Sequence, residues 1–121
     1  MKERIFDLEE RMVAFAVRVI RVAEALPKTT VGNHIRLQLL RSGTSPAANY
    51  GEAQSAESRS DFVHKLKIVL KELRETRIWL LVIRRAELIK PVTNLDPLTQ
   101  ETHELISIFV KSAKTASKGR P

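Results

Sequence analysis

Apolar residues recur along the chain every three or four positions, the spacing that places them on one face of an α-helix. In the first segment, steps of four and three join Leu8, Met12, Phe15, Val19, Val22 and Leu26. Pro27 ends this row, because the residue before a proline avoids the helical region. The pattern predicts a first helix over about residues 6–26.

The second segment starts at Thr29 or Thr30, either of which can cap a helix. Val31, Ile35 and Leu39 carry its apolar face. The polar run Ser42-Gly43-Thr44-Ser45-Pro46 follows, and glycine and proline bend or break helices. We therefore expect a second helix over about residues 30–56 that is bent near Pro46.

The third and fourth segments repeat the spacing of the first. We expect a third helix over about residues 60–88, capped by Ser58 or Ser60, and a fourth over about residues 96–116. The third row comprises Phe62, Leu66, Val69, Leu73, Thr76, Leu80 and Ile83. The fourth comprises Leu98, Thr102, Leu105, Phe109, Ser112 and Ala116. Residues 117–121 are expected to fray.

Four amphipathic helices with short connections predict an all-α fold, an antiparallel up-down-up-down four-helix bundle. With 121 residues, the chain is expected to form one domain over residues 1–121. It has no cysteine, which excludes disulfides and thiolate chemistry and fits a reducing compartment. Its charged first residues and short apolar runs predict neither a secretory signal nor a membrane span. We therefore expect a cytoplasmic protein that does not associate with membranes.

The outer surface of the third helix is apolar in its second half. The run from Ile78 to Ile83 is hydrophobic on every side of the helix, whereas a monomeric bundle covers only one stripe. We therefore predict a homo-oligomer with Ile78, Leu81 and Val82 at the subunit interface. The alternative is a monomeric bundle with an unusually hydrophobic surface.

The formal net charge is +7, from 21 Lys and Arg against 14 Asp and Glu. The outward line of the third helix carries the cations Lys67, Lys71, Arg74 and Arg85. This stripe predicts binding of RNA or DNA, mainly through phosphates and with little sequence specificity. Aromatic residues are few and most are expected in the core, so a stacking surface for single strands is not expected. Two alternatives are a simple solvated face and another basic row at Arg4, Arg11 and Arg18.

Polar residues also interrupt the apolar pattern. We expect them to form one structural cluster of Arg41, Asn49, Glu52, Glu72 and Glu75, because a buried carboxylate needs a partner. The alternative is an acid/base or metal site. A di-iron bundle needs two Glu-x-x-His motifs, however, and the chain has none, while His34, His64 and His103 lie far apart. The sequence thus predicts no catalytic residue, no metal site and no cofactor.

Several blocks along the chain resemble a family of small bacterial proteins first noted as open reading frames in intervening sequences of large-subunit ribosomal RNA genes. The blocks are Ala48-Asn49-Tyr50-Gly51-Glu52-Ala53, Ser58-Arg59-Ser60-Asp61-Phe62, Leu70-Lys71-Glu72-Leu73-Arg74-Glu75-Thr76 and Trp79-Leu80. The resemblance covers roughly residues 6–113. It implies an antiparallel four-helix bundle, a ring that is typically a homopentamer, and no known enzymatic activity.

The chain is also similar, in expected fold and in basic charge, to the accessory protein of diversity-generating retroelements. That resemblance implies a basic pentamer that works with a reverse transcriptase and nucleic acid. Two functional hypotheses follow: a non-enzymatic oligomer that binds RNA or DNA, and a protein-interaction scaffold for a partner enzyme such as a reverse transcriptase.

Overall fold

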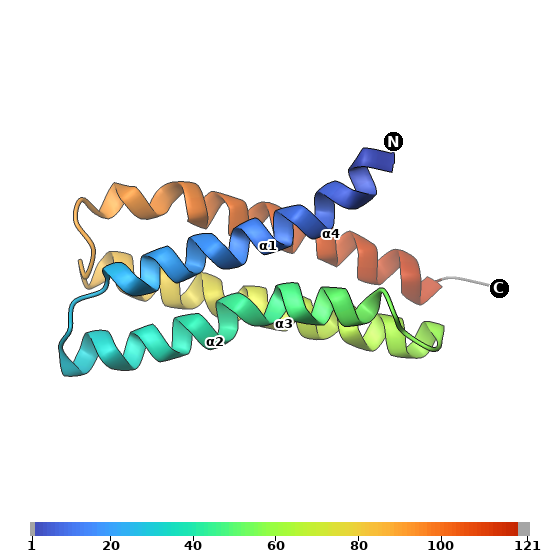
Figure 1. The fold of residues 1–121 in the computed structure, drawn as a ribbon, viewed down its shortest axis with the longest axis horizontal. Helices are drawn as coiled ribbons and strands as arrows, with labels where there is room; N and C mark the ends of the chain where they lie inside the picture. The colour runs from blue at the N-terminus through green and yellow to red at the C-terminus, as the bar shows by residue number, and fades with distance from the viewer. Residues whose placement is uncertain (1, 119–121) are drawn as a thin grey trace.

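The computed structural model describes the backbone of residues 2–118 and the side chains of residues 8–118. The described chain forms four α-helices and contains no strand (Figure 1). They are α1 (Lys2–Ala25), α2 (Thr30–Ala53), α3 (Arg59–Arg85) and α4 (Asp96–Lys118), with a short 3₁₀ helix, η1 (Val92–Leu95), before α4. The predicted all-α bundle is confirmed.

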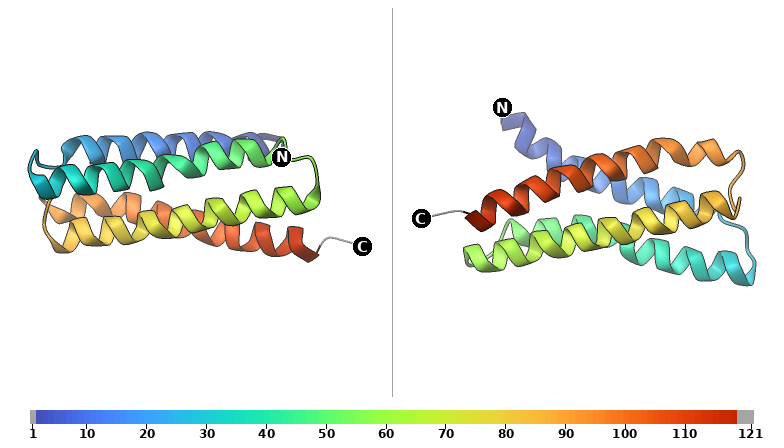
Figure 2. Two further views of the ribbon diagram at one scale, coloured as in Figure 1. Left: turned by 90° about the horizontal axis from the view of Figure 1, so that it is seen from below. Right: turned by 180° about the vertical axis from the view of Figure 1, so that it is seen from behind.

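Each connection reverses the chain, so consecutive helices run side by side in opposite directions (Figures 1 and 2). α1 packs on α2, α2 on α3, and α3 on α4. α1 and α4 meet over a much shorter stretch, and the N-terminal part of α1 leads away from the other helices (Figure 2). One end of the bundle is therefore less closely packed than the other.

The apolar rows predicted for α1, α3 and α4 supply most of the core. Its largest fully buried side chains are Phe15, Phe109, Met12, Leu39, Leu66, Leu73, Leu80, Ile83, Leu95, Leu105, Val19 and Val69. Several expected core residues, Val22 among them, are less buried than predicted. Val31 is 57% exposed, and the neighbouring Gly32 is buried instead. Phe62 is only partly buried, at the beginning of α3.

α2 continues through Pro46 to Ala53, so the polar run does not break the helix. Its small residues serve close packing instead. A Cβ atom on Gly43 would lie 2.4 Å from Val19 Cγ1, so only glycine permits this approach of α1 and α2. The buried Thr76 hydroxyl donates to Ser42 Oγ at 3.0 Å, which joins α3 to α2. The bend expected near Pro46 stays a prediction.

The helix ends follow local rules. Thr29 and Ser58 cap α2 and α3 by accepting backbone N–H bonds from Gly32 and Asp61, each at 3.0 Å. α3 ends at Arg85, earlier than expected, because Glu87 adopts a left-handed backbone with φ 54°. Leu88 N–H then donates to the Ile83 carbonyl at 3.0 Å, which closes the last turn.

α1 and α4 extend slightly beyond their expected limits, to Lys2 and Lys118 respectively. Ser117 and Lys118 are therefore helical, whereas we expected them in a frayed tail. The rest of that tail, residues 119–121, lies outside the described residues. Between residues 2 and 118, no helix is both long enough and apolar enough to cross a membrane.

Candidate nucleic-acid interface

The four cations predicted to contact nucleic acid, Lys67, Lys71, Arg74 and Arg85, are all exposed on α3. Within residues 8–118, Lys67, Arg74 and Arg85 form no ion pair. Lys71 is 74% exposed, and its Nζ lies 3.9 Å from a carboxylate oxygen of Glu72. Most of this positive charge is therefore available to a partner.

The glutamates of α3 and α4 turn away from the face that these two helices share, whereas Asp96, at the start of α4, pairs with Arg84 of α3. Glu72 and Glu75 of α3 bond Arg41 of α2. Glu101 and Glu104 of α4 bond Arg11 of α1, with N–O distances of 2.7 and 2.8 Å. Arg11, from the alternative basic row, is thus neutralised, and the Arg4 side chain lies outside the described residues.

Arg77 is a cation of this face that the sequence analysis missed. It lies one heptad before Arg84, which donates to Asp96 at the start of α4 at 3.0 Å, so both point toward α4. In the described part of the chain Arg77 has no carboxylate partner. The heptad relation to Arg84 was visible in the sequence, but the helix that it faces was not.

α4 adds Lys114 to the same region. Lys114 is exposed and lies thirteen residues after Glu101. At about 100° per residue, this spacing places Lys114 roughly 140° around α4 from Glu101, which marks the side that faces α1. We call Lys67, Arg74, Arg77 and Lys114 the basic face. Among residues 8–118, none of these four cations is paired with a carboxylate, so the basic face can bind polyanions through charge-assisted hydrogen bonds.

The expected polar cluster forms only in part. Arg41 bonds both Glu75 and Glu72, the latter at 3.4 Å, and donates to Gln38 at 3.0 Å. Trp79 Nε1 donates to Glu75 at 3.0 Å. This bond, followed by the bonds from Arg41, lowers the pKa of Glu75. Glu72 is only 8% exposed, so Arg41 compensates a nearly buried charge.

Asn49 and Glu52 lie elsewhere on α2. Asn49 donates to Ser45 Oγ at 2.8 Å within its own helix. Glu52 pairs with Lys65 at 2.6 Å. The reason is the antiparallel packing: Glu52 is eleven residues after Arg41, so it meets an earlier turn of α3. The cluster is therefore Arg41, Glu72 and Glu75, joined by Gln38 and Trp79.

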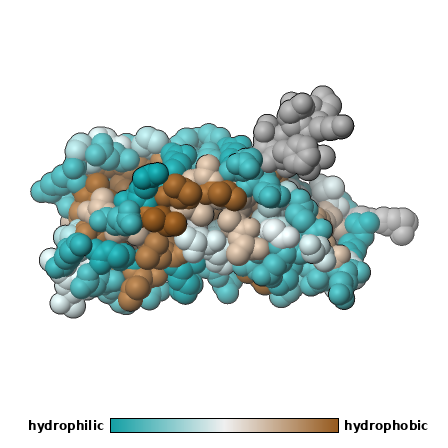
Figure 3. All heavy atoms as spheres, viewed as in Figure 1, coloured by the Kyte–Doolittle hydropathy of each residue, from teal (hydrophilic) through white to brown (hydrophobic). Residues whose placement is uncertain are grey.

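The predicted subunit-interface residues have mixed exposure. Ile78 is 45% and Val82 37% exposed, whereas Leu81 is partly buried. Large exposed apolar residues also occur on α1 and α2, and Figure 3 shows apolar surface across the face of these helices. These residues are Val13, Val17, Ile20, Val31 and Leu37. The apolar surface is therefore wider than the α3 stripe of Ile78, Leu81 and Val82.

Among the side chains of residues 8–118, no group of three or more histidines and carboxylates is arranged to hold a metal ion. The carboxylates of the polar cluster are engaged by Arg41 and Trp79. The chemistry that this surface supports is binding of anions by fixed cations.

Comparisons with known proteins agree with the resemblance seen in the sequence. The family model for the 23S rRNA-intervening sequence protein matches residues 6–111. One similar solved structure is a protein of unknown function from the S23 ribosomal protein family of Bacteroides thetaiotaomicron. It is 34% identical, with a TM-score of 0.82, and the match covers 88% of this chain and 98% of that chain. No curated protein matches.

Proposed function

Because this chain belongs to the family of 23S rRNA-intervening sequence proteins, we propose that it is a non-enzymatic, cytoplasmic bundle that assembles with copies of itself. In this proposal the assembly binds RNA or DNA through the basic face, with little preference for sequence. The name of the family refers to ribosomal RNA, which is one candidate ligand.

The observation that carries the proposal is the separation of charge around α3 and α4. Their glutamates pair with α1 and α2, while Lys67, Arg74 and Arg77 have no acidic partner among the described residues. Cations arranged along two adjacent helices can follow a phosphate backbone and release its counterions. Phosphate contacts carry no direct base information, so the expected binding is weakly specific.

A charge-reversal experiment tests this face. We expect Lys67, Arg74 and Arg77, changed together to Glu, to abolish most binding of a labelled 20-base-pair duplex and to flatten its salt dependence. The matched control reverses Arg21, Lys28 and Lys90, which lie on α1, in the turn after it and in the connection after α3. Each reversal removes two charge units, so both variants fall from +7 to +1. Equal losses in the two variants, measured by fluorescence anisotropy, would mean that net charge and not the face controls binding.

Self-association is supported by the exposed apolar residues. Burying Ile78 and Val82 against another copy removes apolar area from water, which favours assembly. The family resemblance leads us to expect five chains.

We predict that light scattering of the wild type gives a mass well above 13.7 kDa, and that Ile78→Lys reduces this mass because the charge would be buried without a partner. Gln100→Lys, on the exposed surface of α4, is the control. A wild-type monomer at micromolar concentration would contradict this part of the proposal.

A second candidate function is a scaffold for a partner enzyme such as a reverse transcriptase. The observation that favours it is the exposed apolar surface on α1 and α2, which lies outside the subunit contact proposed for Ile78 and Val82 of α3. If the wild type bound no nucleic acid even at low salt, this candidate would replace the first.

A further inference from the structure

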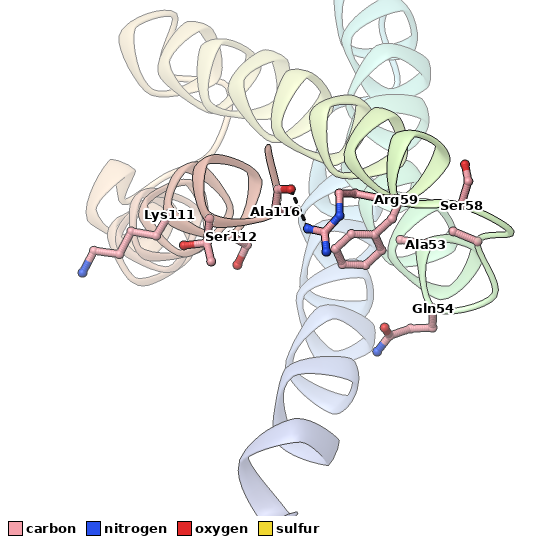
Figure 4. Close-up of a pocket in the computed structure, with 10 residues that line it drawn as sticks. Ala53, Gln54, Ser58, Arg59, Lys111, Ser112 and Ala116 are labelled. Carbon is pink, nitrogen blue, oxygen red and sulfur yellow. Dashed lines mark hydrogen bonds between the residues drawn. The ribbon is translucent and has the colours of Figure 1, made fainter. Parts of the chain in front are cut away.

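A groove opens at the end of the bundle where the α2–α3 turn faces the C-terminal half of α4. Its volume is about 900 Å³. Figure 4 shows Lys111, Ser112 and Ala116 on one wall, with Gln54 and Arg59 across from them. The described residues that line it are Ala53, Gln54, Ala56, Ser58, Arg59, Phe62, Lys111, Ser112, Thr115 and Ala116.

The groove exists because small side chains meet where large ones fill the rest of the core. Ala53, Ala56, Ser112 and Ala116 leave the space between α2 and α4 unfilled. Phe62, which the apolar row of α3 assigned to the core, is only partly buried and lines this space. The floor therefore offers an aromatic ring to an occupant.

The charged residues that line the groove indicate an anionic occupant. Arg59 and Lys111 line the groove, and none of the described residues that line it is a carboxylate. Arg59 donates to the Ala116 carbonyl at 3.0 Å, which fixes its guanidinium between the groove and a smaller one of about 560 Å³. Lys67 of the basic face lines the smaller groove, and its lining too includes no carboxylate from the part of the chain that the structure describes. An anionic partner with a flat apolar part fits this combination.

We propose that the larger groove receives an unpaired nucleobase, so that the protein prefers single-stranded to double-stranded nucleic acid. This inference rests on the proposed function, because the basic face would hold the phosphates beside the groove. Unstacked bases bind by stacking on aromatic rings and guanidinium planes, here Phe62 and Arg59. The sequence led us to expect no stacking surface, because it placed Phe62 in the core, whereas Phe62 is only partly buried and lines the groove. Bases inside a duplex are already stacked and cannot enter.

The remaining polar groups suit a base edge. Gln54 Nε2 donates to Tyr50 Oη at 3.0 Å, which holds the amide in place and leaves its carbonyl oxygen to accept a bond from an occupant. The hydroxyls of Ser112 and Thr115 stand on the α4 side of the groove and can donate or accept. Because hydroxyls adapt to either role, we expect the groove to accept more than one kind of base.

The test compares a labelled 12-nucleotide single strand, with one internal 2-aminopurine, and the blunt duplex of the same sequence. We expect the wild type to bind the single strand more tightly and to change the 2-aminopurine fluorescence. Filling the groove with Ser112→Leu and Thr115→Leu should weaken single-strand binding about tenfold and leave duplex binding unchanged. The control Ser107→Leu adds the same side chain on the exposed surface of α4, outside the groove.

A second variant, Phe62→Leu, keeps an apolar side chain but removes the ring, and should cause a similar loss for the single strand alone. An unchanged ratio of single-strand to duplex affinity in both variants would overturn the inference while leaving the basic face intact. A filled variant with a smaller assembly mass would also overturn it, because the groove would then be a contact between subunits. If the wild type bound neither oligonucleotide, the proposed function would fail together with this inference.

Discussion

At the scale of single residues, Glu72 combines near-complete burial with a long ion pair. It is 8% exposed, and Arg41 Nη1 lies 3.4 Å from its carboxylate. We predict that Glu72→Ala lowers the free energy of unfolding by about 1–3 kcal/mol, because Arg41 loses a partner and a small cavity opens. Thermal melting checks the effect against Glu10→Ala, an exposed change on α1. Equal melting temperatures for the two variants would show that Glu72 has no stabilising role.

Glu75 makes the stability depend on pH. Hydrogen bonds from Trp79 and Arg41 lower its pKa from the ordinary value of about 4.5, so the folded state favours the ionised carboxyl. This stabilisation is present above pH 4.5 and is lost as the pH falls through the lowered pKa. We predict that the difference in melting temperature between the wild type and Glu75→Gln shrinks as the pH is lowered from about 6 to about 3. A difference that stayed constant over this range would contradict the assignment.

Some residue roles could not be read from the sequence. Arg36 donates to the carbonyls of Ala23, Leu26 and Pro27 at 3.0, 2.8 and 3.2 Å. It thereby supplies hydrogen-bond donors to backbone carbonyls at the end of α1 that have no partner within the helix. These acceptors precede it by nine to thirteen residues across a turn, a distance at which no local pattern applies. The Arg41–Glu72 pair was predictable, since a charge on an otherwise buried row requires a partner nearby.

At the scale of helices, the glycines of α2 give a matched test of packing. We predict that Gly43→Ala destabilises the protein by about 1–3 kcal/mol, because its Cβ would overlap Val19 of α1. Gly51→Ala, in the same helix, meets nothing within 4 Å and should stabilise by about 0.4–1 kcal/mol through a less flexible unfolded chain. Denaturant unfolding measures both. Opposite signs support the close approach of α1 and α2, and stabilisation by both changes would refute it.

The helices themselves were largely predictable, because a row such as Leu66, Val69 and Leu73 has only one buried arrangement on a helix. The residues at which the helices end were less predictable. Glu87 stops α3 in a left-handed conformation that usually calls for glycine, and no glycine marks the position. Pro46 suggested a break, but its neighbours Ser42 and Gly43 serve contacts with α3 and α1, which the sequence of α2 alone does not show.

At the scale of the whole molecule, the cations of the basic face lie on the surface of α3 and α4, and the glutamates of these helices form ion pairs with α1 and α2. The exposed cations of α3 were visible from its heptads, whereas the contributions of Arg77 and Lys114 depend on which helix neighbours which. The same holds for the end groove, because its walls come from the α2–α3 turn and from α4, which are distant in the chain. The sequence pattern therefore predicts which cations face outward. Which of them have no carboxylate partner depends on how the helices pack.

The most direct test of the basic face is lysine footprinting of the wild-type protein. Lysines are acetylated with and without saturating single-stranded nucleic acid, and protection is quantified by mass spectrometry. We predict protection of Lys67 and Lys114, because phosphates would cover them, and unchanged labelling of the exposed Lys28 at the α1–α2 turn. Protection of Lys28 with continued labelling of Lys67 and Lys114 would contradict the assignment of nucleic-acid binding to the α3–α4 surface.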